Sequence, residues 1–262
     1  MLYRDVSPVS KKAWEEIDER AVEVLKSYLS ARKVMHVVGP MGLNYNAVPE
    51  GRLANVDEVD GVSYGNYKVV PLTESRVEFE IDRWELDNVD RGAKDVDYGP
   101  LEEAMQRIAL FEEKAIFEGL DQAIIEGLDK EKCHAPIIFG SDAKAIMDSI
   151  TEGIIKLRQS YVKAPYTLVV SPEAYKRILS EETAYPLDER IEELIGGKIV
   201  LNHAIEGAYL LPYDHEDLEL TIGRDFSIGY QNHTNEKVKF FVKESFTFRV
   251  LDEAIIIKYN LK

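Results

Sequence analysis

The chain has 262 residues, of which 45% are hydrophobic and 31% charged, and these proportions are ordinary for a folded protein with a sizeable core. The formal net charge of −16 disfavours bulk binding of nucleic acid, because a surplus of carboxylates repels phosphate groups. Since the single cysteine excludes an intramolecular disulfide and no apolar run reaches the roughly 20 residues of a membrane span, we expect a cytoplasmic protein without a membrane partner.

The first predicted element is an amphipathic helix from Ser10 to about Ser30. Ser10 is a typical N-cap, and the following residues place an apolar stripe opposite a charged face at helical spacing. The stripe consists of Trp14, Ile17, Ala21, Val24, Leu25 and Tyr28. A short strand is predicted at 34–38, and the Gly-, Asn-, Asp- and Pro-rich segment 39–66 indicates loop and short strands.

The segment 74–84 predicts a strand with one solvated face. Val77, Phe79 and Ile81 alternate strictly with charged residues, which is the period of an extended chain. Because the other face is so strongly charged, we interpret this strand as part of a two-stranded arm over 52–83 that projects and docks on a partner. An isolated ribbon of two strands is at best marginally stable in water, so the partner must stabilise it.

A long helix and an α+β module are predicted next. The helix runs from Pro100 to about Leu128 with one apolar stripe, which makes it roughly 40 Å long at ~1.5 Å per residue. Helices and short strands then alternate over 136–222 and indicate a compact module. A strand is predicted at 238–250, where the alternation is nearly unbroken, and a last strand at 254–257.

The motifs of catalysis and metal binding are missing from the sequence. The five histidines and the cysteine form no spaced metal motif, and neither a phosphate-binding glycine loop nor a nucleophile elbow occurs. We therefore expect no catalytic residue and no metal site. Trp84 has two interpretations: a packing residue at the base of the arm, or an aromatic platform for a flat ligand, helped by Arg76. Tyr185, in an acidic loop, has the same two interpretations.

Six blocks of sequence, in order along the chain, carry a family resemblance. They are WEEIDERA at 14–21, ARK at 31–33 before VGP at 38–40, WELDNVDRG at 84–92, YPLDER at 185–190, DFSIGY at 225–230 and ESFTF at 244–248. Together they resemble the signature of the encapsulins, also called linocin-type bacteriocins, and they cover essentially the whole chain.

The resemblance implies an α+β architecture, namely the major capsid fold of phage Hong Kong 97. In that fold residues 1–50 would hold the N-terminal helix and arm with the start of the peripheral domain. Residues 51–83 would form the E-loop, which docks on a neighbouring subunit, and 84–135 the peripheral domain with its spine helix. Residues 136–222 would form the axial domain, and 223–262 the C-terminal strands of the peripheral domain.

The resemblance also implies a function. Encapsulins are shells that self-assemble into icosahedral particles and enclose a cargo enzyme, such as a ferritin-like iron-storage protein or a dye-decolorising peroxidase. The cargo carries a C-terminal peptide that binds the inner wall between the N-terminal helix and the peripheral sheet. The matching positions here are Leu25, Leu29, Arg32, Val34, His36, Ile228 and Tyr230. Some relatives have an acidic residue where this chain has His36.

Two further sites follow from the resemblance. Some encapsulins bind a flavin, FMN or another, on the outer surface, although the shell requires no cofactor. The matching positions are Trp84, Arg76 and Tyr185. The acidic loop at 181–190 would line a pore, with Glu181, Glu182, Thr183, Ala184 and Tyr185 nearest the opening.

Two other function classes stay open at this point. A phage-type major capsid protein shares the fold and packages nucleic acid, which the acidic composition disfavours. Relatives have also been described as bacteriocins or proteases, and the missing nucleophile motifs speak against an enzyme. The contents of purified particles, nucleic acid or protein, distinguish the first two classes.

Overall fold

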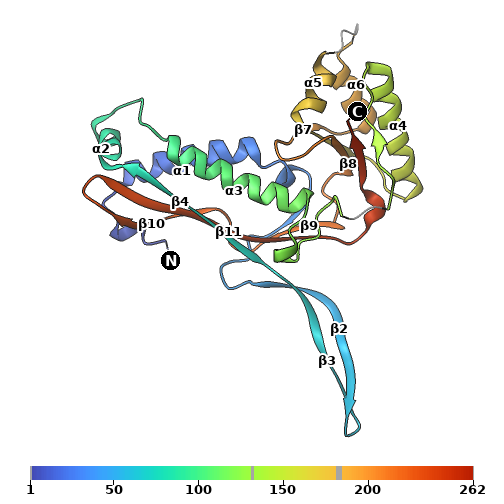
Figure 1. Ribbon diagram of the computed structural model, residues 1–262, viewed down its shortest axis with the longest axis horizontal. Helices are drawn as coiled ribbons and strands as arrows, with labels where there is room; N and C mark the ends of the chain where they lie inside the picture. Colours follow the sequence, from blue (N-terminus) through green and yellow to red (C-terminus); the bar gives the residue numbers. More distant parts are fainter. Residues whose placement is uncertain (1, 131–132, 181–184, 262) are drawn as a thin grey trace.

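The computed structural model describes residues 2–130, 133–180 and 185–261, which form two packed bodies and a projecting ribbon (Figure 1). The first, which we call the peripheral body, is a five-stranded sheet with two long helices along one face. Its strands are β1 His36–Val38, β4 Thr73–Asp82, β9 Leu218–Ile222, β10 Ser227–His233 and β11 Lys237–Val250. The sheet order is β1–β9–β11–β10, and β4 also pairs with β11. The remaining elements are η1 Arg4–Val6, α1 Lys11–Tyr28, η2 Ala31–Lys33, α2 Arg83–Arg91, α3 Gly99–Phe117 and η3 Asp121–Ala123.

Helix α1 forms as the sequence predicts. The Ser10 hydroxyl accepts a hydrogen bond from the Ala13 amide at 3.1 Å, which satisfies one of the free donors of the first turn. Its apolar stripe is buried against α3 and the sheet, where Trp14 meets Phe240 edge to face at 5.3 Å. This packing fixes α1 over β11 and β10, the region in which the candidate site lies.

The charged strand predicted at 74–84 is not part of a projecting arm, and that prediction is wrong. Its residues form β4, which pairs antiparallel with β11 without interruption, Thr73 opposite Phe246 and Asp82 opposite Lys237. The apolar face of β4 packs under the helices, and its charged face is matched by lysines of β11. Trp84 lies beyond this strand, in the first turn of α2.

Helix α3 is shorter than predicted. It has 19 residues and ends at Phe117, so its length is roughly 28 Å at ~1.5 Å per residue. Gly119, with φ +88°, turns the chain, and the Leu128 amide then returns to donate to the Ile116 carbonyl at 2.9 Å. The apolar residues after Gly119 therefore belong to a turn and not to a longer stripe. None of the described helices is both long and apolar enough to cross a membrane.

The second body, which we call the axial body, is a five-stranded sheet with the order β5–β12–β8–β6–β7, covered by three helices. Its elements are β5 Ile137–Ile138, α4 Ala143–Gln159, β6 Tyr166–Val170, α5 Pro172–Ser180, α6 Leu187–Ile195, β7 Ile199–Leu201, β8 Ala208–Pro212, η4 Glu253–Ile255 and β12 Ile257–Asn260. The module predicted at 136–222 therefore differs at its end. Strand β9 pairs with β1 and β11 in the peripheral sheet, whereas β12 lies between β5 and β8.

The projecting element is a ribbon of β2 Ala47–Val59 and β3 Val62–Pro71, which leaves the peripheral body and extends away from both sheets (Figure 1). The prediction of loop and short strands at 39–66 is therefore wrong over most of that range. The strands could not be recognised in the sequence because two register shifts interrupt the alternation of apolar and polar residues. These shifts lie between Pro49 and Leu53 and between Ala54 and Asp57. The projecting part comprises 47–71 and not the expected 51–83.

Candidate functional site

Four of the residues matched to the cargo groove share one apolar cluster. Leu25 and Leu29 lie at the end of α1, Ile228 and Tyr230 lie on β10, and all four are buried against the peripheral sheet. The Tyr230 hydroxyl lies 2.5 Å from Nδ1 of His233. Strand β10 is paired on one side only, with β11, so its other edge borders the site.

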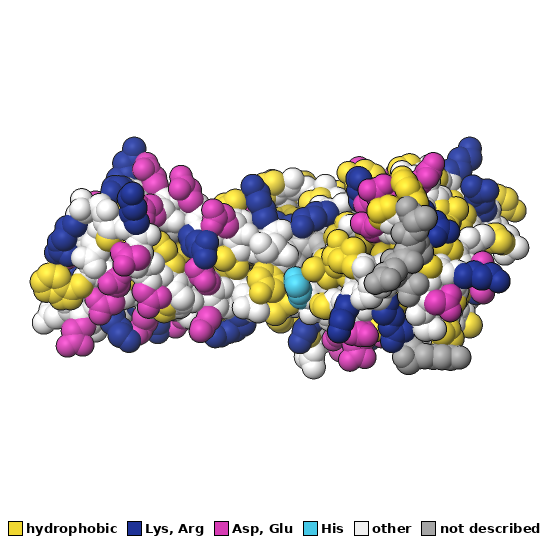
Figure 2. All heavy atoms as spheres, turned by 90° about the horizontal axis from the view of Figure 1, so that it is seen from above, with side chains coloured by type: hydrophobic (Ala, Val, Ile, Leu, Met, Phe, Trp, Pro, Cys, Tyr) yellow, Lys and Arg dark blue, Asp and Glu magenta, His cyan; other side chains and the backbone are white. Residues whose placement is uncertain are grey.

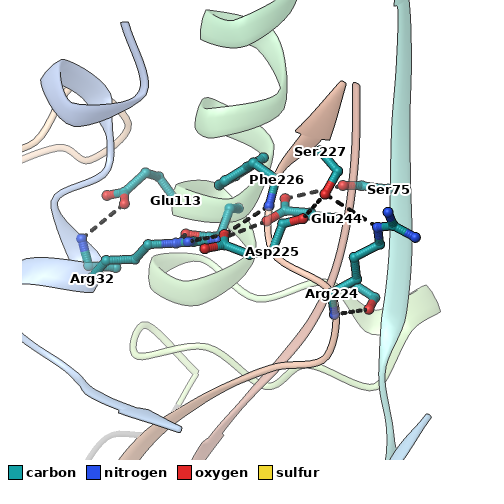
Figure 3. Close-up of polar contacts among 11 residues, drawn as sticks. Arg32, Ser75, Glu113, Arg224, Asp225, Phe226, Ser227 and Glu244 are labelled. Atoms are coloured by element: carbon teal, nitrogen blue, oxygen red, sulfur yellow. Dashed lines mark hydrogen bonds and ion pairs between the residues drawn. The ribbon is translucent and has the colours of Figure 1, made fainter. Parts of the chain in front are cut away.

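Arg32 connects this cluster to the body through three carboxylates, two of which are buried (Figure 3). Its guanidinium donates to Glu112 at 2.6 and 2.8 Å, to Asp225 at 2.7 Å and to Glu244 at 3.1 Å. It also lies 4.5 Å from the ring centre of Phe226, at the approach to β10. Arg32 therefore joins the segment after α1 to α3, β10 and β11, and little of its charge is left for an external ligand.

The carboxylates around Arg32 are more numerous than its charge can balance. Glu112 and Glu244 are fully buried, and burial together with the neighbouring Glu112 raises the pKa of Glu244 well above its ordinary value. Ser75 donates a hydrogen bond to Glu244 at 3.1 Å, which opposes the rise. One arginine thus faces three carboxyl groups, and the raised pKa of Glu244 means that this group holds its proton to a higher pH than an exposed glutamate does.

Glu113 forms a second buried junction one residue further along α3. It accepts hydrogen bonds from the Ser30 hydroxyl at 2.5 Å, the Ala31 amide at 2.9 Å and Nδ2 of Asn202 at 2.7 Å. Burial raises the pKa of Glu113 to about 8, and these donors act in the opposite direction. Because Asn202 follows β7 of the axial body, Glu113 ties the two bodies together at the end of α1.

The remaining two residues matched to the groove lie apart from it. Val34 is fully buried in a different core cluster, which joins the axial body to β9 and the end of β11. His36 begins β1 and places Nδ1 2.9 Å from a carboxylate oxygen of Asp214. The structure therefore brings together Leu25, Leu29, Arg32, Ile228 and Tyr230, and leaves Val34 and His36 outside.

The three residues matched to a flavin site do not meet within one subunit. Trp84 is 67% exposed in the first turn of α2, where the guanidinium of Arg91 lies 5.3 Å from its ring centre. Arg76 lies on β4, where it stacks on Phe241 at 4.0 Å. The six steps from Arg76 to the end of β4 at Asp82 alone span roughly 20 Å at ~3.3 Å per residue, and Trp84 lies beyond that end. Tyr185 lies two residues before α6 of the axial body, and α6 lies far from α2 and β4 (Figure 1).

The residues matched to a pore fall largely outside the described part of the chain, which excludes 181–184 and thus Glu181, Glu182, Thr183 and Ala184. Tyr185 is exposed just before α6, and a hydrogen bond with Glu189, together with the charge of that carboxylate, raises the pKa of its hydroxyl. Within the described ranges, no group of His, Cys, Asp and Glu side chains is arranged to hold a metal ion.

The helix face beside the site carries both signs of charge. Figure 2 shows Lys, Arg, Asp and Glu side chains interspersed over this face, without a large field of one sign. On α1 the charges pair locally, as Arg20 does with Glu23 at 2.8 Å and with Glu102 of α3 at 2.6 Å. Such a surface gives no continuous cationic track for a nucleic-acid backbone.

The buried carboxylates were missed by sequence reasoning, although two signals point to them. Glu244 occupies an inward position in the alternation of 238–250, between Val242 and Phe246. Glu112 follows Ile108 by one helical turn, on the apolar stripe of α3. A charged residue within a buried series indicates a paired or protonated group.

Comparisons with known proteins agree with this architecture. A family profile described as "Encapsulating protein for peroxidase" matches residues 1–247. The chain is 37% identical over 249 residues to a type 1 encapsulin shell protein of Mycolicibacterium paratuberculosis, with 94% of each chain covered. It is 35% identical over 258 residues to the type 1 encapsulin shell protein of Rhodococcus erythropolis, with 98% of each covered.

Solved structures share the fold at low sequence identity. The virus-like particle from Pyrococcus furiosus matches with a TM-score of 0.68 at 16% identity, covering 93% of this chain and 97% of that one. The capsid of an empty GTA particle matches with a TM-score of 0.57 at 13% identity, covering 88% and 90%. The predicted phage capsid fold is thereby confirmed.

Proposed function

This chain belongs to the encapsulin family of shell proteins, and from that premise we propose that its shell encloses an enzyme held to the inner wall by a C-terminal peptide. The role of the chain itself is structural: it is a subunit of a capsid-like shell, and its relatives are named as shell proteins and not as enzymes. A peroxidase is the first cargo to test, because the family description names one.

The observation that carries assembly is the β2–β3 ribbon. It projects from the body with large apolar side chains in solvent, among them Tyr67, which is 80% exposed, and its cross-strand partner Leu53. At its root a pocket of about 750 Å³ separates the ribbon from the 124–126 turn and the end of β11. Because such a ribbon is marginally stable alone, we assign it the E-loop role over residues 47–71, docked on a neighbouring subunit.

The cargo peptide is proposed to dock beside β10 and the end of α1. Leu25, Leu29, Ile228 and Tyr230 offer an apolar floor, and the one-sided pairing of β10 offers backbone groups to an extended peptide. The ion pair between Arg32 and Asp225 holds in place the residues that lead into β10. Because its guanidinium is already paired, Arg32 does not offer a free charge to the peptide. We leave Val34 and His36 out of this proposal, because one is fully buried elsewhere and the other pairs with Asp214.

A flavin is proposed only as a ligand shared between subunits. Trp84 presents an exposed ring, but Arg76 is already stacked on Phe241 and Tyr185 lies on another body, so one subunit alone does not fit the group. A neighbouring subunit would have to bring its own Tyr185 or a cation to the Trp84 ring. Similarly, we propose that Tyr185 and the acidic start of α6 meet around a pore in the assembled shell.

The test is electron microscopy of the purified protein together with mass spectrometry of what co-purifies. We expect closed particles that contain one enzyme species and little nucleic acid. Removing the last residues of that enzyme should abolish its encapsulation while leaving the particles intact. Particles filled with nucleic acid would favour a phage-type capsid instead, and a monomer under native conditions would contradict assembly.

A further inference from the structure

The unpaired edge of β10 is not empty, because the chain's own N-terminal residues lie on it. The Tyr230 amide donates a hydrogen bond to the Leu2 carbonyl at 2.8 Å. The Arg4 Nε donates to the Ile228 carbonyl, also at 2.8 Å. These are the outward-facing backbone groups that an added strand would use. Residues 2–6, which we call the clasp, therefore occupy the edge that borders the proposed cargo groove.

The edge is shaped for a second backbone to approach closely. Gly229 lies between the two hydrogen-bonded residues, and a Cβ atom added there would come within 2.8 Å of the Leu2 carbonyl oxygen and 2.3 Å of the Phe241 ring. Only glycine leaves room for both neighbours. Glycine at this position therefore lets the Leu2 carbonyl reach the Tyr230 amide while the Phe241 ring packs over the strand.

One side chain anchors the clasp. Arg4 forms a two-pronged pair with Asp18 of α1 at 2.6 and 2.7 Å, and its guanidinium lies 4.3 Å from the Trp14 ring centre. Ser7 completes the anchor by accepting a hydrogen bond from the Trp14 indole at 3.0 Å. The Arg4 guanidinium of the clasp thereby neutralises the Asp18 carboxylate and covers the Trp14 ring.

The rest of the clasp is weakly held. Tyr3 and Val6 are exposed, and η1 buries none of its residues. Tyr3 also adopts a left-handed backbone with φ 54°, which costs free energy in a residue other than glycine. Few buried contacts and a partly exposed ion pair are features of segments that open locally at small cost.

We propose that the clasp is a displaceable occupant of the β10 edge, and that the cargo peptide binds there as an added strand once the clasp has opened. This inference rests on the cargo-binding function proposed above. The chemistry of the vacated edge sets the partner: an extended peptide with apolar side chains, which suit the apolar floor, and one basic residue. That residue replaces Arg4 between Asp18 and Trp14, where it restores both the ion pair and the contact with the ring.

A closed clasp lowers the apparent affinity of the edge. The measured dissociation constant is the intrinsic one divided by the open fraction, so a clasp closed about 90–99% of the time weakens binding about 10- to 100-fold. Loosening the anchor should therefore tighten peptide binding. A purely structural N-terminus would give the opposite result, since its loss would disturb α1 and the groove beside it.

The experiment measures binding of a fluorescent synthetic peptide that matches the C-terminal tail of the enzyme found with the shell. Particles are reassembled in its presence, and bound fluorescence is titrated after size exclusion. We expect Arg4→Ala to bind about 10-fold more tightly than the unaltered chain, and deletion of residues 2–6 up to about 100-fold. Lys11→Ala is the matched control, because its exposed pair with Glu15 lies outside the clasp.

A second probe separates the clasp from the cargo site. The unlabelled peptide LYRDVSPV, residues 2–9 of this chain, should displace the tail peptide from shells that lack residues 2–6. Equal tail affinity in all variants, or no displacement, overturns the clasp while the cargo function stands. Binding to none of the variants overturns both. Should the deletion prevent reassembly, the Arg4→Ala affinity decides.

Discussion

Two pairs of strands in this chain expose opposite kinds of side chain to solvent: one pair exposes charged residues and the other exposes apolar residues. On the β4–β11 pair, charged side chains face outward and find partners across the strands, as Glu78 does with Lys239 at 2.7 Å and Glu74 with Lys243 at 3.4 Å. On the β2–β3 ribbon, the side chains of Leu53 and Tyr67 are apolar and largely exposed among the described residues of the subunit.

The difference shows which exposed surface requires a partner. The charged face of β4 is complete within the subunit, because its apolar side packs under α3 and its charges are paired. The ribbon buries almost nothing on either face, so its free energy comes from whatever docks on it. In the sequence we interpreted exposed charge as the docking signal, whereas we now propose that the exposed apolar side chains of the ribbon have that role.

The largest expected effect tests the ribbon. Leu53→Asp combined with Tyr67→Asp places two like charges opposite each other on the surface that we propose neighbours bury. Each lost apolar contact is worth about 1.5–3 kcal/mol, repeated in every subunit, so we expect particles to be lost while the subunit stays folded. Negative-stain microscopy and circular dichroism measure the two outcomes.

The matched control for the ribbon neutralises a charged pair on the other surface. Glu80→Gln with Lys237→Gln removes one cross-strand ion pair and leaves the apolar ribbon unchanged. We expect normal particles. Loss of particles in the control, or normal particles in the ribbon variant, would reverse the roles of the two surfaces.

The next effect concerns the body that carries the ribbon. Arg32→Met removes the cation from Glu112 and Glu244, and breaking a buried pair in this way costs about 3–5 kcal/mol of unfolding free energy. Urea denaturation of the disassembled subunit measures it. Arg20→Met is the control, with little change expected, because the ion pairs of Arg20 are partly exposed. A similar loss of unfolding free energy in both variants would mean that the buried cluster stabilises the subunit no more than an exposed ion pair does.

The third effect is a pH dependence of the same body. The pKa of Glu113 is about 8 in the folded chain against an ordinary 4.5, so the folded state holds this proton more tightly than the unfolded state does. The unfolding free energy should therefore fall as the pH rises from about 4.5 to about 8, by at most ~1.4 kcal/mol per pH unit.

Glu113→Gln keeps the shape of this side chain without its titration, so the slope of stability against pH should decrease. It should not vanish, because the raised pKa of Glu244 acts in the same direction. Chemical denaturation at several pH values measures the slope. An unchanged slope would exclude Glu113 as the titrating group.

The smallest effect returns to the charged strands. Lys239→Gln removes the cation nearest to Glu78, whose pKa is lowered by its hydrogen bond with that lysine. Because the pair is partly exposed, the melting temperature should fall by about 2 °C or less, and salt should remove the difference. A large fall would show that cross-strand charge supports the sheet more than its apolar face does.

The sequence predicted correctly those elements that depend on interactions between residues close together in the chain. The Ser10 cap and the stripe of α1, and the alternation of β11, were predicted from spacing alone. It failed where pairing decides, since alternation in 74–84 shows that one face is solvated but not that its partner is β11. Register shifts concealed β2, and Gly119 ended α3 within an apolar run.

The candidate site divides in the same way. The resemblance supplied Leu25, Leu29, Arg32, Ile228 and Tyr230, which the fold brings together, and also Val34, which it buries elsewhere. The clasp could not be predicted, because two of its bonds use the backbone carbonyls of Leu2 and Ile228. Backbone contacts leave no residue type by which a sequence could reveal them.

The position of β12 has a consequence for how the subunit is made. This strand lies inside the axial sheet between β5 and β8, yet the ribosome adds Ile257–Asn260 after every other strand of that sheet. A nascent chain that already exposes its apolar ribbon thus still lacks an interior strand of the axial body. Domains generally fold as units during synthesis, so this body is completed late, and we expect subunits to join only after translation has passed residue 260.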